Sequence, residues 1–125
     1  MRFPWPRAKP LGQRGEDLAT KALKREGYII LERNVHLGRY ELDIIAREGD
    51  TVAFVEVKTR RRDDIASPEE NVNSTKQLHI TRAANIYMSH ADDPDTYYRF
   101  DVVSVLIPDR GKRSVTIYRD AFRVK

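Results

Sequence analysis

Two alternating segments joined by a glycine turn constrain the fold of this chain more than any other feature of its sequence. Residues 39–47 and residues 51–60 each alternate apolar and polar side chains. Segments of this kind around a two-residue connection such as Gly49-Asp50 predict a β-hairpin. With these two residues in the turn, Asp43 lies directly opposite Glu56, and opposed residues have Cβ atoms roughly 5 Å apart.

The alternation also predicts which side chains share a face of the hairpin. Lys58 follows Glu56 by two residues, so both side chains are expected on the face of Asp43. The opposite face is predicted to be apolar and to consist of Leu42, Ile44, Ala53, Val55 and Val57. The hairpin therefore brings two acids and one lysine together within an otherwise apolar pair of strands.

Two carboxylates that face each other repel, which disfavours a purely structural hairpin. A divalent cation between them would remove the conflict, because Mg²⁺ prefers oxygen ligands and usually binds one or two carboxylates together with waters and phosphate. Lys58 could then place its ammonium group beside the attacking water or the scissile phosphate. The alternative is that Glu56 and Lys58 form an ordinary exposed ion pair and that Asp43 is solvated.

The rest of the sequence predicts further helices and strands. Residues 11–26 read as an amphipathic helix, and Ser74 with Gln77 three residues later forms a capping box for a second helix that runs to about residue 89. The other predicted elements are strands at 28–31, 100–107 and 114–118, the last at a sheet edge, and a polar loop at 61–73. This order indicates an α/β fold in which helices flank a mixed sheet.

Composition limits the class of protein. At 125 residues the chain is long enough for one domain with a hydrophobic core, predicted to span residues 11–125. Residues 1–10 contain three prolines and are expected to form a flexible basic tail. The chain has no cysteine, no signal-peptide segment at its start and no apolar run near the ~20 residues of a membrane span. We therefore expect a cytoplasmic protein without disulfides or a membrane partner.

The net charge of +4 gives only weak support for nucleic-acid binding. The first ten residues hold three basic side chains and no acid, so the remainder of the chain is nearly neutral. Attraction for phosphate must therefore come from local clusters. Arg60, Arg61 and Arg62 directly follow the hairpin and could contact backbone phosphates without reading sequence. The alternative is that these charges are simply solvated.

Two other charged positions interrupt apolar patterns. At 100° per residue Lys76 falls on the helix face of Ile80 and Ala83, so it is expected to reach past the core towards a phosphate or a site carboxylate. Its alternative is to extend into solvent. Asp101 lies in an apolar strand where an unpaired charge is costly, so a structural ion pair with Arg99 is expected.

Several short motifs resemble a known family. Asp43, twelve intervening residues and Glu56-Val57-Lys58 resemble the PD-(D/E)XK signature of the restriction-endonuclease-like superfamily. More closely, the chain resembles the YraN family, also called UPF0102, which is similar to archaeal Holliday-junction resolvases. The matching stretches are GQRGEDLA (12–19), ELDII (41–45), FVEVKTR (54–60), STKQ (74–77), RFDVV (99–103) and YRDAF (118–122). One departure is Tyr40, which stands where the family has glycine, so the loop before the hairpin is expected to differ.

The resemblance implies a restriction-endonuclease-like αβββαβ core and metal-dependent hydrolysis of DNA, including branched recombination intermediates. By motif match, Asp43 and Glu56 are ligands of Mg²⁺ or Mn²⁺, and Lys58 is the catalytic lysine. Glu16 corresponds to an acid of the first helix that completes the catalytic metal site, and Lys76 to a basic residue of the second helix. From its position alone, Glu16 could equally be a solvated acid favoured by the helix dipole. Because resolvase relatives act as dimers, a homodimer is also implied.

Two hypotheses about function therefore remain. The first is a metal-dependent endonuclease that acts on DNA. The second is a non-catalytic nucleic-acid-binding module that has kept the nuclease fold. Loss of Asp43, Glu56 or Lys58 would favour the second hypothesis, and none of the three is lost.

Overall fold

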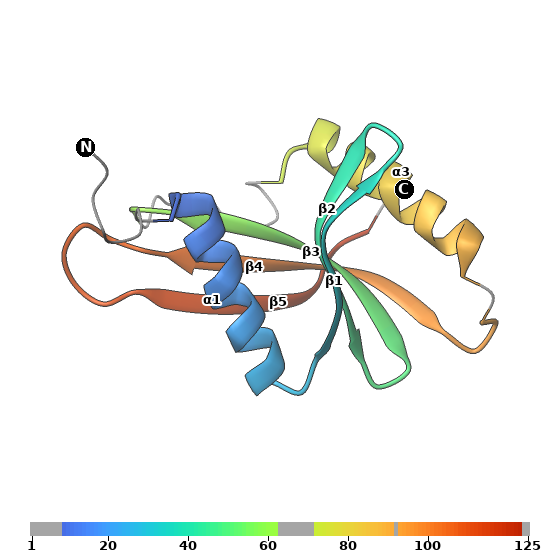
Figure 1. The fold of residues 1–125 in the computed structure, drawn as a ribbon, viewed down its shortest axis with the longest axis horizontal. Helices are drawn as coiled ribbons and strands as arrows, with labels where there is room; N and C mark the ends of the chain where they lie inside the picture. The colour runs from blue at the N-terminus through green and yellow to red at the C-terminus, as the bar shows by residue number, and fades with distance from the viewer. Residues whose placement is uncertain (1–8, 63–71, 92, 124–125) are drawn as a thin grey trace, which may run out of the picture.

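The computed structural model of the chain describes residues 9–62, 72–91 and 93–123 (Figure 1). Most of the predicted tail and of the predicted loop at 61–73 lie outside the described residues. The described elements are α1 (Leu11–Arg25), β1 (Ile29–Leu37), β2 (Tyr40–Glu48), β3 (Thr51–Arg60), α3 (Ser74–His90), β4 (Tyr97–Leu106) and β5 (Ser114–Phe122). The predicted order of helices and strands is confirmed.

The five strands form one sheet in the order β1-β2-β3-β4-β5. β1, β2 and β3 are antiparallel neighbours, β4 is parallel to β3, and β5 is antiparallel to β4. A parallel neighbour needs a crossover connection, and the segment that contains α3 provides it. The sheet is therefore mixed, and the chain has the α/β class and the αβββαβ order of a restriction-endonuclease-like core.

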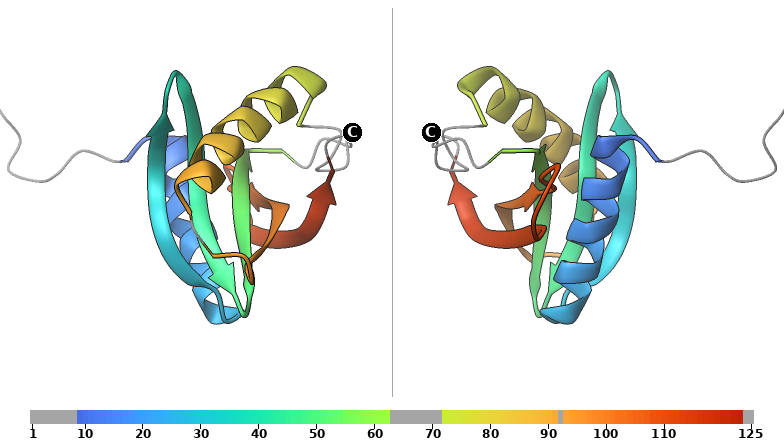
Figure 2. Two further views of the ribbon diagram at one scale, coloured as in Figure 1. Left: turned by 90° about the vertical axis from the view of Figure 1, so that its right-hand side faces the viewer. Right: turned by 90° about the vertical axis from the view of Figure 1, so that its left-hand side faces the viewer.

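The two helices cover opposite faces of the sheet (Figure 2). One apolar layer lies between α1 and the sheet and contains Ala19, Leu23, Ile44, Ala46, Ala53, Val55, Val103 and Val105. The other lies on the α3 side and contains Leu42, Ile45, Phe54, Ile80, Ala83, Ala84 and Val102. The central strands are thus buried on both faces, as a strand with a parallel neighbour usually is.

The β2–β3 hairpin has the predicted register. Glu48 lies opposite Thr51 across the Gly49-Asp50 turn, and pairing continues as far as Ile44 opposite Val55. Gly49 has φ 62°, a left-handed conformation that glycine adopts without steric cost. Asp43 and Glu56, predicted to be the next opposed pair, lie just beyond the last backbone pair of this ladder.

The assignment of Leu42 to the face of Ile44 was wrong. Leu42 packs in the α3 layer with Ile45, whereas Ile44 packs in the α1 layer. Pairing between β2 and β3 ends at Ile44, and Asn34 on β1 has φ 51° beside this point, between the pairs that Ile44 and Leu42 make with β1. Strict alternation fails here because the strand leaves the regular ladder at Asp43.

Strand β1 is longer than the predicted strand at 28–31. Residues 31–34 in its middle are all exposed, as befits an edge strand, and they interrupt the apolar pattern before Val35 and Leu37, which pack against the α3-side layer. β1 forms a hairpin with β2 through Gly38, which has φ 63°, and Leu37 lies opposite Tyr40. Tyr40 is therefore the first residue of β2, and the glycine of this turn lies two positions earlier.

The first residue of α3 is Ser74, but its N-cap is Asn73 rather than the predicted Ser74. The Asn73 side chain accepts a hydrogen bond from the backbone N–H of Lys76 at 2.9 Å. Gln77 donates its side-chain amide to the carbonyl of Val72 instead of completing a capping box. The predicted helix is confirmed, with its cap one residue earlier.

Candidate metal and nucleic-acid site

Glu56 is the buried acid of the hairpin. It lies in the middle of β3, and only 6% of its surface is exposed. Burial, followed by the charge of Asp43 and a hydrogen bond between the two carboxyl groups, raises the pKa of Glu56 to about 8. The charges of Lys76 and Lys58 act in the opposite direction. A carboxyl group with such a pKa lacks enough positive charge around it to be ionised at low cost.

Asp43 is held at the point where β2 separates from β3. Its Oδ2 accepts a hydrogen bond from the backbone N–H of Val57 at 2.9 Å. This side-chain bond follows the last backbone pair of the ladder, Ile44 with Val55. The carboxylate of Asp43 is therefore fixed next to Glu56, because a bond to the rigid backbone of a central strand leaves it little freedom.

Lys76 reaches the carboxyl group of Glu56 from helix α3, which packs on this face of the sheet. It lies in the first turn of α3, and its Nζ is 3.7 Å from Oε1 of Glu56. This is one of the two partners expected from the sequence, the site carboxylate. Asp43, Glu56, Lys58 and Lys76 thus form one charged cluster on the α3 side of the sheet, where the charges of the other three act on Glu56.

The donor set of this cluster fits a hard divalent cation. Asp43 and Glu56 present carboxylate oxygens from two adjacent strands, and a cation between them would relieve the repulsion that raises the pKa of Glu56. Within residues 9–62, 72–91 and 93–123, no group of three or more His, Cys, Asp or Glu side chains is placed to hold a metal ion. The protein would therefore supply two ligands, and water and phosphate the others, an arrangement common for Mg²⁺.

Glu16 does not join the two acids of the hairpin. Its Oε1 accepts hydrogen bonds from Arg33 Nε at 3.0 Å and from Asn34 Nδ2 at 2.9 Å. These bonds attach the first helix to β1, and Arg33 also donates to Asp17 at 2.7 Å. The carboxylate is neither a simple solvated acid nor a third member of the charged cluster.

Gly15, which precedes Glu16, has a packing role that the sequence pattern did not predict. A Cβ placed on Gly15 would meet the side chain of Thr59 on β3, at 2.8 Å from its Cβ. The helix can therefore approach β3 closely, one residue beyond Lys58, only with glycine there. A glycine inside a helical pattern was the available signal, since it usually has a packing reason.

The arginines after the hairpin differ in their surroundings. Arg60 is partly buried and places an Nη2 3.5 Å from the hydroxyl of Ser104. Arg61 donates to Asp109 at 2.8 Å, and both side chains are at least half exposed. Arg62 is exposed. Arg60 ends β3 and the other two residues directly follow it in the chain, and the charge of Arg61 is already paired with Asp109.

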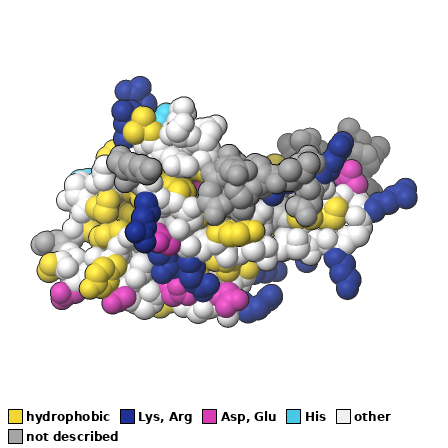
Figure 3. Space-filling model, turned by 180° about the vertical axis from the view of Figure 1, so that it is seen from behind, with side chains coloured by type: hydrophobic (Ala, Val, Ile, Leu, Met, Phe, Trp, Pro, Cys, Tyr) yellow, Lys and Arg dark blue, Asp and Glu magenta, His cyan; other side chains and the backbone are white. Residues whose placement is uncertain are grey.

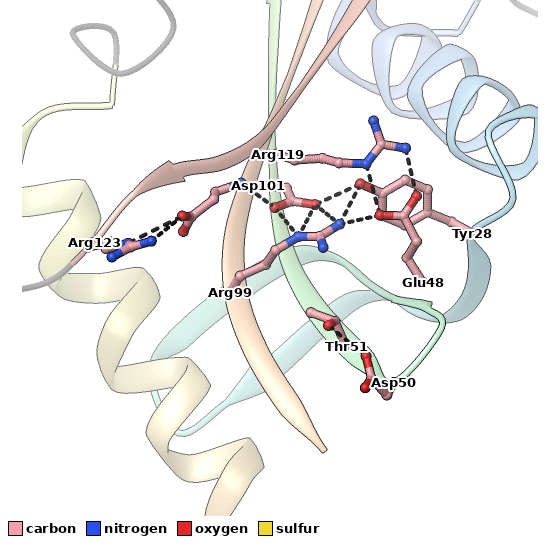
Figure 4. Close-up of polar contacts among 9 residues, drawn as sticks. Tyr28, Glu48, Asp50, Thr51, Arg99, Asp101, Arg119 and Arg123 are labelled. Atoms are coloured by element: carbon pink, nitrogen blue, oxygen red, sulfur yellow. Dashed lines mark hydrogen bonds and ion pairs between the residues drawn. The ribbon is translucent and has the colours of Figure 1, made fainter. Parts of the chain in front are cut away.

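Asp101 forms the predicted ion pair with Arg99, whose Nε lies 2.9 Å from Oδ1 (Figure 4). The acid is fully buried and also accepts from the Tyr28 hydroxyl at 2.8 Å. The sequence did not predict that Glu48 would join Arg99 to Arg119, with both guanidinium groups 2.6 Å from its oxygens. This network fastens β2, β4 and β5 together and plays a structural role.

In the part of the chain that the structure describes, no helix is both long and apolar enough to cross a lipid bilayer.

Comparison with known proteins identifies the family. Residues 15–105 match the profile of the "Uncharacterised protein family UPF0102". A UPF0102 protein of Chlorobaculum parvum is 44% identical over 108 residues, which cover 86% of this chain and 84% of the relative. A UPF0102 protein of Caldicellulosiruptor bescii is 44% identical over 118 residues, which cover 91% of this chain and 98% of the relative. The matched region includes the whole charged cluster, and the chain therefore belongs to the UPF0102 family.

Proposed function

We propose that this chain is a Mg²⁺- or Mn²⁺-dependent endonuclease that hydrolyses phosphodiester bonds of DNA. The observation that carries the proposal is the pairing of a buried acid with a second, backbone-anchored acid, Glu56 with Asp43, beside two lysines. Structural sites seldom keep two carboxylates together without a cation. The family resemblance adds branched DNA as the preferred form of the substrate.

Each residue of the cluster has a separate task. Asp43, held by the N–H of Val57, and Glu56, held by its strand, would bind the metal ion in a fixed position. A metal ion bound there lowers the pKa of a coordinated water and neutralises charge on the phosphoryl group. Lys58 would donate its ammonium group to phosphoryl oxygens whose negative charge increases in the transition state.

Lys76 would bind substrate. Its ammonium group extends from the first turn of α3, and its side chain is 40% exposed although it reaches Glu56. Once a metal ion replaces Lys76 as the partner of the Glu56 carboxylate, the lysine can contact a backbone phosphate. Arg60, Arg61 and Arg62 would contact further phosphates of the same strand as it leaves the site.

The test is cleavage of a labelled four-way junction and of a linear duplex of the same length, each with Mg²⁺, Mn²⁺ or EDTA. We expect cutting only with metal, and a loss of about 100-fold or more in D43N and in K58M. D50N is the matched control, because Asp50 lies in the turn of the same hairpin and is exposed. Its activity should equal that of the wild type.

The same experiment separates the two hypotheses about function. Metal-dependent cutting that D43N and K58M abolish supports the endonuclease. Absence of any cutting above the level of these variants would rule it out, and DNA binding that persists without cutting would favour a non-catalytic binding module.

A further inference from the structure

A groove lined by basic residues runs along the side of α1 that faces β5. Its volume is about 610 Å³, and its lining includes Lys21 and Arg25 from the helix and Arg113 and Arg119 from β5 and the residue before it. Glu26 is the one acid among its lining residues. A neighbouring hollow of about 460 Å³ shares Arg113 and adds two more cations, Arg14 and Lys112. The candidate active site explains none of these residues.

The basic residues of the helix lie on one stripe. At 100° per residue, Arg14, Lys21 and Arg25 fall within about 40° of one another. The distance from the first to the last is roughly 16 Å at 1.5 Å per residue. One strand of DNA rises about 3.4 Å per phosphate, so this length corresponds to about five phosphates. The spacing suits contacts along a backbone rather than to a single phosphate group.

Three of the basic side chains that line the groove form no ion pair within the described residues. Among residues 9–62, 72–91 and 93–123, neither Lys21, Arg25 nor Arg113 forms an ion pair with an acid. Arg119 differs, because it is bound to Glu48 and lies over the ring of Tyr28 (Figure 4). One wall of the groove is thus fixed by the polar network, while its other cations remain available for an external anion.

The groove lies across the sheet from the candidate active site. α1 crosses β4 and β5 on the near side in Figure 1, whereas Lys76 reaches Glu56 from α3, which covers the other face (Figure 2). Lys and Arg side chains also project from the end of the molecule that carries the turn between β4 and β5 (Figure 3). A nucleic-acid segment in the groove would therefore be separate from the one at Asp43 and Glu56.

We propose that the α1–β5 groove binds the phosphate backbone of a second nucleic-acid segment. This proposal rests on the proposed function in one respect only: the first segment is the one that would bind at Asp43 and Glu56. Arginine suits the role because its guanidinium group can bind a phosphate through two hydrogen bonds. An anionic membrane fits less well, because a helix that binds a bilayer inserts its apolar face. The apolar residues of α1, such as Ala19 and Leu23, are buried against the sheet.

The test measures DNA binding by the full chain in EDTA, where no metal-dependent cutting occurs. Fluorescence anisotropy gives the affinity for a labelled duplex and a labelled four-way junction over a range of salt concentrations. In the triple variant K21Q/R25Q/R113Q, we expect the slope of log affinity against log salt to fall by about 2 to 3 and the affinity to fall at least about tenfold. The triple variant should also lose any preference for the junction over the duplex.

A matched pair on the same helix shows whether the position of the charge matters. K21Q should lower the salt slope by about 0.9, since one phosphate contact is lost. K24Q removes the same charge from an exposed lysine three residues away that does not line the groove, so it should leave the slope unchanged. R25K keeps the charge and should keep the slope. Circular dichroism would confirm that each variant is folded.

Several results would overturn the proposal. Wild-type affinity in the triple variant, or equal losses in K21Q and K24Q, would show that the groove is not the binding site. Equal affinity of the wild type for duplex and junction would contradict the binding of a second nucleic-acid segment. A triple variant that loses binding only to phosphatidylserine vesicles would make the groove a membrane surface.

The outcome is independent of the endonuclease proposal. A chain that never cuts DNA but needs the groove to bind it keeps this inference and loses the nuclease. If the chain cuts DNA with metal and the triple variant binds and cuts like the wild type, the endonuclease proposal stands and the groove proposal fails.

Discussion

The ammonium nitrogen of Lys76 lies 3.7 Å from Oε1 of Glu56, an acid that is 6% exposed. The lysine belongs to the first turn of α3 and the acid to the middle of β3, so the pair joins the helix to the sheet at the candidate metal site. The charge of Lys76 lowers the pKa of Glu56, against the effects of burial and of Asp43. Lys76 therefore supplies part of the positive charge that a metal ion would supply.

Replacing Lys76 by glutamine should separate metal binding from substrate binding. Lys76 and a metal ion compete for Glu56, so K76Q should bind Mn²⁺ more tightly than the wild type does, while its affinity for DNA falls. Isothermal titration with Mn²⁺ and anisotropy with DNA measure the two effects. R82Q is the control, because Arg82 is exposed on the same helix and bonds to Tyr40 instead. Weaker Mn²⁺ binding in K76Q would contradict this account.

The pH dependence of stability should reveal the buried state of Glu56. Its pKa is about 8 in the folded chain against 4.5 for the ordinary group, so the folded state holds more protons between these values. The free energy of unfolding should therefore fall as pH rises from about 5 to 8, by at most roughly 1.4 kcal/mol per pH unit. Urea unfolding in EDTA at several pH values measures it.

The variant E56Q isolates that effect, because glutamine does not titrate. Its stability should vary less between pH 5 and 8 than that of the wild type, and it should exceed the wild type most at pH 8. The same slope in both proteins would mean that Glu56 is ionised at little cost in the folded chain.

Much of the fold could be predicted from the sequence because its elements carry local signals. The alternation on both sides of Gly49 fixes the register of the hairpin as far as Ile44 and Val55, and Asp43 and Glu56 are the next residues of the two strands. The apolar stripe of α3 similarly predicts that Lys76 points towards the sheet. In these cases the pattern along the chain and the packing of the folded protein require the same arrangement.

Other features could not be predicted because they depend on contacts between distant residues. Residues 31–34 of β1 are all exposed and show no apolar alternation, since an edge strand exposes much of its surface. Leu42 leaves the face of its neighbours because β2 departs from the ladder at Asp43. The role of Glu48 appears only once β4 and β5 bring Arg99 and Arg119 beside it.

The contribution of Glu48 to the free energy of unfolding should decrease in acid. Bonds from Arg119 and then Arg99 lower the pKa of Glu48 to about 2, from 4.5. Its contribution is complete above about pH 4.5 and is lost as pH falls towards 2. E48Q should therefore lower the free energy of unfolding by about 1–3 kcal/mol at pH 7, and by less at pH 3.

Denaturant unfolding at both pH values measures the difference. E41Q serves as the control, because Glu41 is exposed on the same strand, and it should unfold like the wild type. An E48Q deficit as large at pH 3 as at pH 7 would show that the charge of Glu48 is not what matters.

Adding a methyl group to α1 should be costly at one glycine and harmless at another. In G15A the new Cβ would lie 2.8 Å from Cβ of Thr59, so the helix must shift from β3. We expect a loss of about 1–3 kcal/mol in the free energy of unfolding, the usual cost of overpacking. In G12A the new Cβ meets nothing within 4 Å, and alanine favours helix, so this variant should be neutral or slightly more stable.

The double variant G15A/T59G shows whether the collision itself causes the loss. Glycine at position 59 removes the side chain that the new Cβ would meet, so the double variant should be less destabilised than the sum of its two single changes. Thermal unfolding of all four variants provides the comparison. Because Lys58 precedes Thr59, G15A should also slow metal-dependent cutting more than G12A does, if the helix shift moves β3. Equal stability of G15A and G12A would show that α1 does not need its close approach to β3.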